Sequence, residues 1–162
     1  MNKKLYNNLF LFSLFGIALG FFGILYEGVV YGPKLLDHSM PRMLFWKGFF
    51  ANISPIIYYT PLNQLAAIAL VVLFFMAPKQ NTLLKQRLKW AAVLQIVSFG
   101  ITFYVVSQLN LKQSFGDIGK YADEIPYETV LFNILSVCRL AIVAIALSLV
   151  FKGYIQTQRE QN

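Results

Sequence analysis

The sequence is poor in charged residues, and this scarcity limits the kind of surface that the protein can have. Of its 162 residues, 13% are charged and 57% are hydrophobic. Soluble domains carry about 25% charged residues, so a surface that faces water on all sides is excluded. The composition therefore predicts an integral membrane protein, and the length suits a single domain over residues 1–162.

Cysteine and histidine each occur once, as Cys138 and His38. A lone cysteine excludes a disulfide or a CxxC site within the chain, and we expect Cys138 to be a small buried thiol in an apolar helix. One histidine cannot provide a haem with two axial histidines. His38 with Asp37, Glu27 or Glu124 has no diagnostic metal-ligand spacing, so we expect neither a metal nor another cofactor. Because an imidazole titrates near neutral pH, His38 is a candidate catalytic acid or base.

Long apolar runs are abundant, and four of them approach the ~20 residues that a helix needs to cross ~30 Å of hydrocarbon. Ser54 and Pro55 form a favourable start for the second, and Pro61 is expected to kink it. The first run is longer than the ~7–15 apolar residues of a signal peptide, so we expect an uncleaved span. The sequence thus predicts an all-α fold, a four-helix transmembrane bundle. Its spans cover about residues 9–30, 55–76, 90–106 and 129–151.

The basic residues predict the orientation of this bundle and argue against nucleic-acid binding. The formal net charge is +7, yet the positive residues flank the apolar runs and form no basic arm. Eight of them lie before the first run, between the second and third, and after the fourth, whereas the other two loops hold five. Because cytoplasmic loops are enriched in Lys and Arg, we expect both termini in the cytoplasm, with the protein in a bacterial inner (plasma) membrane. In the first outer loop, the stretch "MPRMLFWKGFF", residues 40–50, suits an interfacial segment.

Two ionisable residues lie within the apolar runs, Glu27 in the first and Arg139 in the fourth. A central arginine costs at least ~2.5–3.5 kcal/mol on membrane-insertion scales, so Arg139 needs a partner or water. A stripe with spacings of four, three and four residues contains Gly16, Gly20, Gly23 and Glu27. On a helix this stripe turns Glu27 toward neighbouring helices. We therefore expect a contact between Glu27 and the long side chain of Arg139.

Other polar side chains are expected at similar depth, in the outer half of the bundle. The inner half is plainer, with Gln95 and Ser98 as its main polar residues. The sequence therefore predicts a polar pocket beneath the two outer loops. Alternatively, these groups only hold the helices together, through interhelical hydrogen bonds of about 0.6 kcal/mol each. The expected ligand-binding residues are Glu27, Tyr58, Tyr59, Asn63, Gln64, Thr102, Tyr104, Asn133, Ser136 and Arg139, and the catalytic candidates are Glu27, Arg139 and His38.

Short motifs accompany the spans in a fixed order. The glycine-rich first span ends in "YEGVVYGPKLLD", and "FFANISPIIYYTPLN" leads into the second. The third span ends in "TFYVVSQLNLKQ", and the fourth contains "FNILSVCRL". Over roughly residues 9–151, this series resembles the anthrone-oxygenase-like family of small four-helix membrane proteins, mostly of unknown function. The positions that the resemblance highlights are Pro33, Asn52, Pro55, Thr102, Asn110, Asn133 and Arg139.

Three functions are open on this reading of the sequence. A binding protein would hold a lipophilic small molecule in the outer pocket. The resemblance implies a cofactor-independent oxygenase acting on an anthrone-like aromatic substrate, in which Arg139 would stabilise an oxyanion and Glu27 would abstract a proton. The third is a small scaffold subunit of a larger membrane complex, and a homo-oligomer is also left open. The expected partner in every case is the lipid bilayer, and in none is it nucleic acid.

Overall fold

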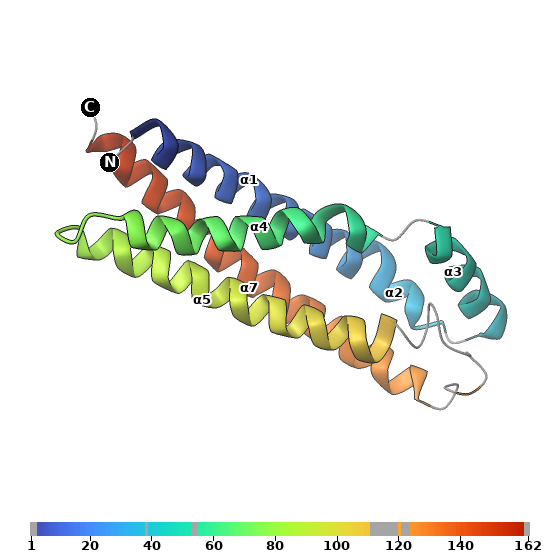
Figure 1. Cartoon of the computed structure of the whole chain (residues 1–162). Helices are drawn as coiled ribbons and strands as arrows, with labels where there is room; N and C mark the ends of the chain where they lie inside the picture. The colour runs from blue at the N-terminus through green and yellow to red at the C-terminus, as the bar shows by residue number, and fades with distance from the viewer. Residues whose placement is uncertain (1–2, 38, 53–54, 111–119, 121–123, 161–162) are drawn as a thin grey trace.

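The computed structural model describes residues 3–37, 39–52, 55–110, 120 and 124–160, with the side chains at 31, 34–35, 46, 49–52, 55–59 and 109–110 outside that description. Every regular element in these ranges is a helix (Figure 1). The two η elements are π-helices, in which the hydrogen bonds span five residues rather than four. In chain order the elements are α1 (Lys3–Tyr26), η1 (Glu27–Tyr31), α2 (Gly32–Leu35), α3 (Met40–Asn52), α4 (Pro55–Met76), α5 (Thr82–Val105), η2 (Val106–Asn110) and α7 (Ile125–Arg159).

The longest helices are those of a membrane protein. Large apolar side chains cover their outer surfaces: Phe15, Phe75 and Phe103 are 64%, 76% and 67% exposed. Lipid, rather than water, suits such a surface. α4 contributes a shorter apolar stretch, Thr60–Met76. Within the described parts of the chain, three stretches are long and apolar enough to cross a membrane: Lys3–Val30, Thr82–Gln108 and Ile125–Arg159.

The long helices run side by side in alternating directions (Figure 1). α1 contacts α4 and α7, and α5 also contacts α4 and α7. The start of α1, the end of α7 and the α4–α5 turn share one end of the bundle, which we call the termini end (Figure 1). At this end Nε2 of Gln158 donates a hydrogen bond to Oδ1 of Asn7 at 3.2 Å. The opposite end, where α2 and α3 lie, is the loop end.

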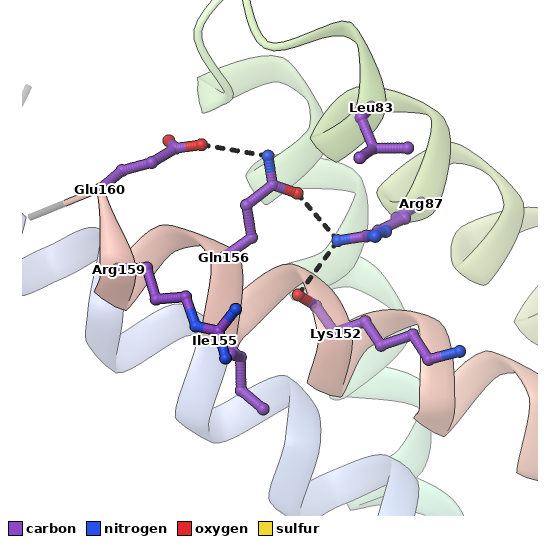
Figure 2. A pocket seen from close by; sticks show the side chains of 7 residues that line it. All are labelled: Leu83, Arg87, Lys152, Ile155, Gln156, Arg159 and Glu160. Carbon is purple, nitrogen blue, oxygen red and sulfur yellow. Dashed lines mark hydrogen bonds between the residues drawn. The ribbon is translucent and has the colours of Figure 1, made fainter.

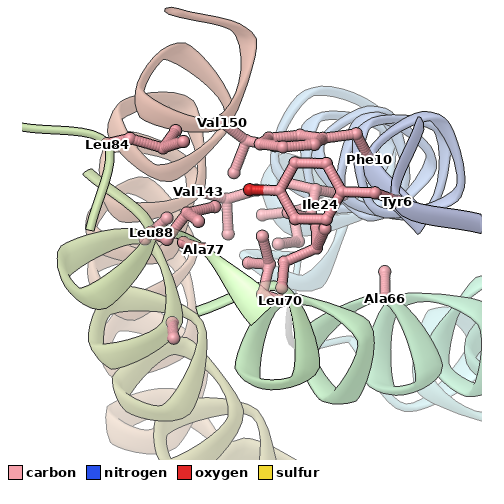
Figure 3. Packing of buried hydrophobic residues seen from close by; sticks show 14 residues of the cluster. Tyr6, Phe10, Ile24, Ala66, Leu70, Ala77, Leu84, Leu88, Val143 and Val150 are labelled. Atoms are coloured by element: carbon pink, nitrogen blue, oxygen red, sulfur yellow. The ribbon is translucent and has the colours of Figure 1, made fainter. Parts of the chain in front are cut away.

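Most members of the apolar core come from the termini-end halves of the helices, and Figure 3 shows how they pack. The ring of Tyr6 packs edge-on against Phe10, with 5.3 Å between the ring centroids. All the long helices contribute to this core, so apolar side chains close this half of the bundle. Its fully buried members include Phe10 from α1, Leu70 from α4, Leu88 from α5 and Val150 from α7.

Glycines allow α1 to approach α4 closely. A Cβ at Gly16 would lie 2.5 Å from the Cβ of Ala66 and 2.9 Å from the carbonyl oxygen of Leu62. A Cβ at Gly20 would lie 2.7 Å from Cγ and Oδ1 of Asn63. Both glycines are buried. The stripe that leads to Glu27 is therefore the packed face of α1, as its spacing predicts.

Helix α5 begins earlier than its apolar segment predicts. Its first residue is Thr82, because the side chain of Asn81 accepts a hydrogen bond from the N–H of Leu84 at 3.1 Å and caps the helix. The basic residues at 85–89, expected in a loop, therefore lie on the first turns of α5. Hydropathy marks the part of a helix that faces lipid, and it does not mark where the helix starts.

The other elements differ less from expectation. α4 has the bounds that the sequence predicts, and Pro61 lies inside it, whereas Ser54 lies outside the described residues. α7 extends beyond its apolar segment at both ends, from Ile125 to Arg159. The stretch expected at the membrane interface forms α3, which is set apart from the bundle in Figure 1.

Candidate functional site

Glu27 and Arg139 form an ion pair inside the bundle. Nη1 of Arg139 donates a hydrogen bond to Oε2 of Glu27 at 3.3 Å, and the two side chains are 3% (Arg139) and 9% (Glu27) exposed. This confirms the contact that the sequence predicts. A buried charge is costly unless it is paired, so the pair explains how a membrane helix can contain a central arginine.

The backbone around Glu27 is a π-helix that is held against α7. Glu27 is the first residue of η1, and its carbonyl oxygen accepts a hydrogen bond from the N–H of Gly32, five residues later. Nδ2 of Asn133 donates to the carbonyl oxygens of Gly32 (3.2 Å) and Thr129 (2.9 Å). A Cβ at Gly32 would collide with Oδ1 of Asn133. The Gly32–Asn133 contact thus fixes η1 on α7 and positions the carboxylate opposite Arg139.

Helix α5 brings polar side chains to the same level of the bundle. Nη1 of Arg87 donates to the carbonyl oxygen of Lys152 at 3.2 Å, and Val105 and Phe132 line one narrow crevice. Antiparallel helices both rise about 1.5 Å per residue, so residues between these contacts can be matched by counting. The count places Ser98 level with Arg139, to within about one helical turn.

Helix α4 can be aligned with α5 in the same way. The amine of Lys85 lies 5.7 Å from the ring centroid of Phe74. Counting from this pair toward the loop end places Thr60 near Ser98 and Asn63 near Gln95, to within about one turn. α1 meets this region through Gly20, which contacts Asn63. Each long helix therefore has a polar or glycine residue level with the ion pair, or one turn from it toward the termini end.

Several polar atoms in this region are buried without a hydrogen-bond partner among the described residues. They are Oγ1 of Thr60, Oδ1 of Asn63, Nε2 of Gln95, Oγ of Ser136 and Nε of Arg139. An unsatisfied buried polar group costs about 1–3 kcal/mol, and most such groups in native proteins bind protein or ordered water. The residue counts place the five within about two helical turns of one another, which suits a site for water or for the polar atoms of a ligand. We call these five residues the polar cluster.

The structure does not bring every expected ligand-binding residue to this cluster. Gln64 is exposed on α4, and Tyr104 is 48% exposed on α5. Oγ1 of Thr102 donates to the carbonyl oxygen of Ser98 at 2.8 Å, a bond within its own helix. The side chains of Tyr58 and Tyr59 lie outside the described residues, as does His38.

Sequence reasoning misjudged Cys138 and left Gln95 and Ser98 out of the expected site. Cys138 is exposed rather than buried, because it neighbours Arg139 on α7 and the inward face belongs to Arg139. Gln95 is a member of the polar cluster, and Ser98 is buried one turn from it on α5, although their distance along the third apolar run assigned both to the inner half. The early start of α5 is the reason, since it moves the middle of that helix to about residues 93–94.

Outside the bundle, an exposed ion pair orders the chain between α2 and α3. Nε of Arg42 lies 3.3 Å from Oδ2 of Asp37, and Oδ1 of Asp37 accepts a hydrogen bond from the N–H of Ser39 at 3.1 Å. The hydrogen bonds from Ser39 and then from Arg42 lower the pKa of the Asp37 carboxyl below its ordinary value of 3.8. This pair lies apart from the polar cluster.

Comparison with protein-family models, with curated proteins and with solved structures finds no match for this chain. The resemblance to anthrone-oxygenase-like proteins therefore stays a prediction from the short motifs. Among the described residues, no group of His, Cys, Asp and Glu is placed to hold a metal ion. The site is thus defined by its own geometry: a buried ion pair beside a cluster of unsatisfied polar atoms.

Proposed function

We propose that the protein is a four-span membrane protein that binds a lipophilic small molecule in the loop-end half of its bundle. α1, α4, α5 and α7 would each cross the membrane. The excess of basic residues at the termini end supports a cytoplasmic location for both termini, in a bacterial inner membrane. The ligand site would then lie in the outer half of the bilayer.

The observation that carries this proposal is the incomplete pairing of Arg139. A guanidinium has five N–H donors in a planar fork. Glu27 accepts from Nη1, while Nε is buried and has no partner among the described residues. A carboxylate, phenolate or carbonyl oxygen on a ligand would satisfy that donor. The hydroxyl of Ser136, one helical turn away on α7, would complete the contact.

The surroundings favour a ligand that is mostly apolar. Small-molecule sites are lined mainly by hydrophobic side chains, with a few polar groups that fix orientation. Here the polar cluster lies within the bundle, and an apolar core that includes Leu70 and Val150 fills the half toward the termini end. That core closes the termini end, so the arrangement suits binding from one side and not passage through the bundle.

Native mass spectrometry of gently extracted protein tests the proposal. The wild type is expected to carry a bound small molecule, which Arg139→Gln and Ser136→Ala should lose. Gln64→Ala is the matched control, because Gln64 is a polar residue on α4 that faces outward. Ser136→Ala removes a hydroxyl with no partner among the described residues, so it should leave folding intact even if Arg139→Gln does not.

The same measurement separates the alternatives. Retention of the molecule at wild-type occupancy by both Arg139→Gln and Ser136→Ala would contradict the proposed site. Stoichiometric capture of a larger membrane protein, with no small molecule, would support the scaffold function instead. A separate assay addresses the oxygenase. Oxygen consumption on addition of an anthrone-like substrate, abolished by Arg139→Gln, would support the activity that the resemblance implies.

A further inference from the structure

A second site lies at the termini end, in a groove between α5 and α7 (Figure 2). Its volume is about 470 Å³, and its walls carry the cations Arg87, Lys152 and Arg159. Leu83 and Ile155 give the groove an apolar side. We call it the basic groove. It is far from the polar cluster, so nothing in the proposed small-molecule site uses it.

A hydrogen-bond network holds the groove in shape. Nη1 of Arg87 donates to Oε1 of Gln156 at 2.8 Å, in addition to its bond with the Lys152 carbonyl oxygen. Nε2 of Gln156 donates to Oδ1 of Asn81 and to Oε1 of Glu160, each at 3.0 Å. Gln156 therefore ties α7 to the α4–α5 turn and orients the guanidinium of Arg87 (Figure 2).

Among the described residues that line the groove, Glu160 is the one carboxylate, and it is already engaged. Nδ2 of Asn81 donates to both oxygens of Glu160, at 2.9 and 3.0 Å, and Gln156 supplies the third hydrogen bond. Arg87, Lys152 and Arg159 have no ion-pair partner within the described part of the chain. The described lining residues, three cations and one hydrogen-bonded carboxylate, therefore carry net positive charge.

The groove also lies where the apolar surface of the bundle ends. On α7, Lys152 directly follows Phe151, which is 53% exposed, and on α5 the exposed Trp90 is one turn beyond Arg87. Tryptophan at this position and lysine or arginine beyond it are typical of the level of lipid headgroups. Leu83, half exposed beside the cations, offers an apolar contact for the start of an acyl chain.

We propose that the basic groove binds the phosphate headgroup of an anionic phospholipid. Arginine presents paired donors that match phosphate oxygens, and basic pockets between transmembrane helices suit anionic headgroups. The inference relies on the proposed membrane embedding and not on the small-molecule site. Bound lipid would also brace α5 against α7 at the end where the Asn81–Gln156–Glu160 network joins them.

The test is a titration of the purified full chain with short-chain phosphatidylglycerol, followed by native mass spectrometry. The double variant Lys152→Gln/Arg159→Gln removes two groove cations. The matched control, Lys79→Gln/Lys89→Gln, removes two exposed lysines at the same end that do not line the groove. The groove variant should bind about 30-fold more weakly, the equivalent of ~2 kcal/mol at ~1 kcal/mol per cation near a membrane surface. The control should bind like the wild type.

Short-chain phosphatidylcholine and millimolar inorganic phosphate distinguish the sources of the phosphate. The proposal expects little binding of phosphatidylcholine and little displacement of phosphatidylglycerol by free phosphate. It is overturned if the two double variants weaken binding equally, if phosphatidylcholine binds as tightly, or if inorganic phosphate displaces the lipid. Ser136→Ala should keep its bound phosphatidylglycerol, so a failure of the small-molecule site is seen separately.

Discussion

The close approach of α1 and α4 makes Gly16→Ala a sharp test of the packing. A Cβ at Gly16 would lie 2.5 Å from the Cβ of Ala66 and 2.9 Å from the Leu62 carbonyl oxygen. Neither neighbour is the flexible end of a side chain, so α1 and α4 must separate to admit the methyl group. Overpacking of this kind costs about 1–3 kcal/mol. Gly16→Ala should therefore lose about 1–3 kcal/mol of unfolding free energy relative to the same substitution at a glycine with free space around it.

Gly100 in α5 provides the matched control, because a Cβ there would meet nothing within 4 Å. Alanine is favoured over glycine in a helix by about 1 kcal/mol, so Gly100→Ala should be neutral or stabilising. Gly16→Ala gains the same helix propensity but also strains the α1–α4 contact. Its free energy of unfolding should therefore be about 1–3 kcal/mol below that of Gly100→Ala.

Thermal unfolding in one detergent, followed by circular dichroism, measures the difference. At about 2–4 °C per kcal/mol for a chain of this size, Gly16→Ala should melt roughly 2–12 °C below Gly100→Ala. Equal melting temperatures for the two variants would refute the inferred contact between the α1 and α4 backbones. A melting temperature of Gly100→Ala below that of the wild type would contradict the free space around Gly100.

Three further predictions concern charges and caps. In a double-mutant cycle, Glu27→Gln and Arg139→Gln should each lower the free energy of unfolding by about 3–5 kcal/mol, because each leaves a buried charge unpaired. The double variant should lose clearly less than the sum of the two single losses. Additive losses would contradict the ion pair. Asn81→Ala should lower the free energy of unfolding by about 0.5–2 kcal/mol through loss of the α5 cap, and a melting temperature equal to that of the wild type would argue against the cap. Asp37 should titrate, by carbon NMR of its carboxyl group, with a pKa below the ordinary 3.8. The stabilisation from its hydrogen bonds is present above the unfolded pKa and is lost as pH falls through the lowered, folded pKa. Arg42→Gln should raise the pKa of Asp37 part of the way, and an unchanged pKa in that variant would contradict the contribution of Arg42.

The apolar pattern predicted the bounds of α4 and the packed face of α1. α4 begins at Pro55 and ends at Met76, as its hydrophobic segment indicates, and the glycine stripe correctly places Glu27 on the packed face of α1. The Glu27–Arg139 contact was also predictable, because a charge in hydrocarbon needs a partner and the chain offers few.

The rest depended on features that hydropathy does not encode. α5 starts at the Asn81 cap, in a polar stretch with no membrane signal, and this early start places Gln95 and Ser98 near the middle of the helix. The π-helix η1 has Gly32 as its C-cap, which is held by a tertiary hydrogen bond from Asn133. The Asn81–Gln156–Glu160 network joins residues 75 and 79 positions apart, a distance over which a single sequence gives no pairing signal.

The central claim is that the unsatisfied polar atoms beside the ion pair receive a ligand or water. An experimental map of the protein in lipid nanodiscs, detailed enough to show ordered water, tests it most directly. We predict density that belongs to no protein atom within hydrogen-bond distance of both Nε of Arg139 and Oγ of Ser136. A map in which these two atoms bond instead to other side chains of the protein, with no space left beside them, would contradict the account.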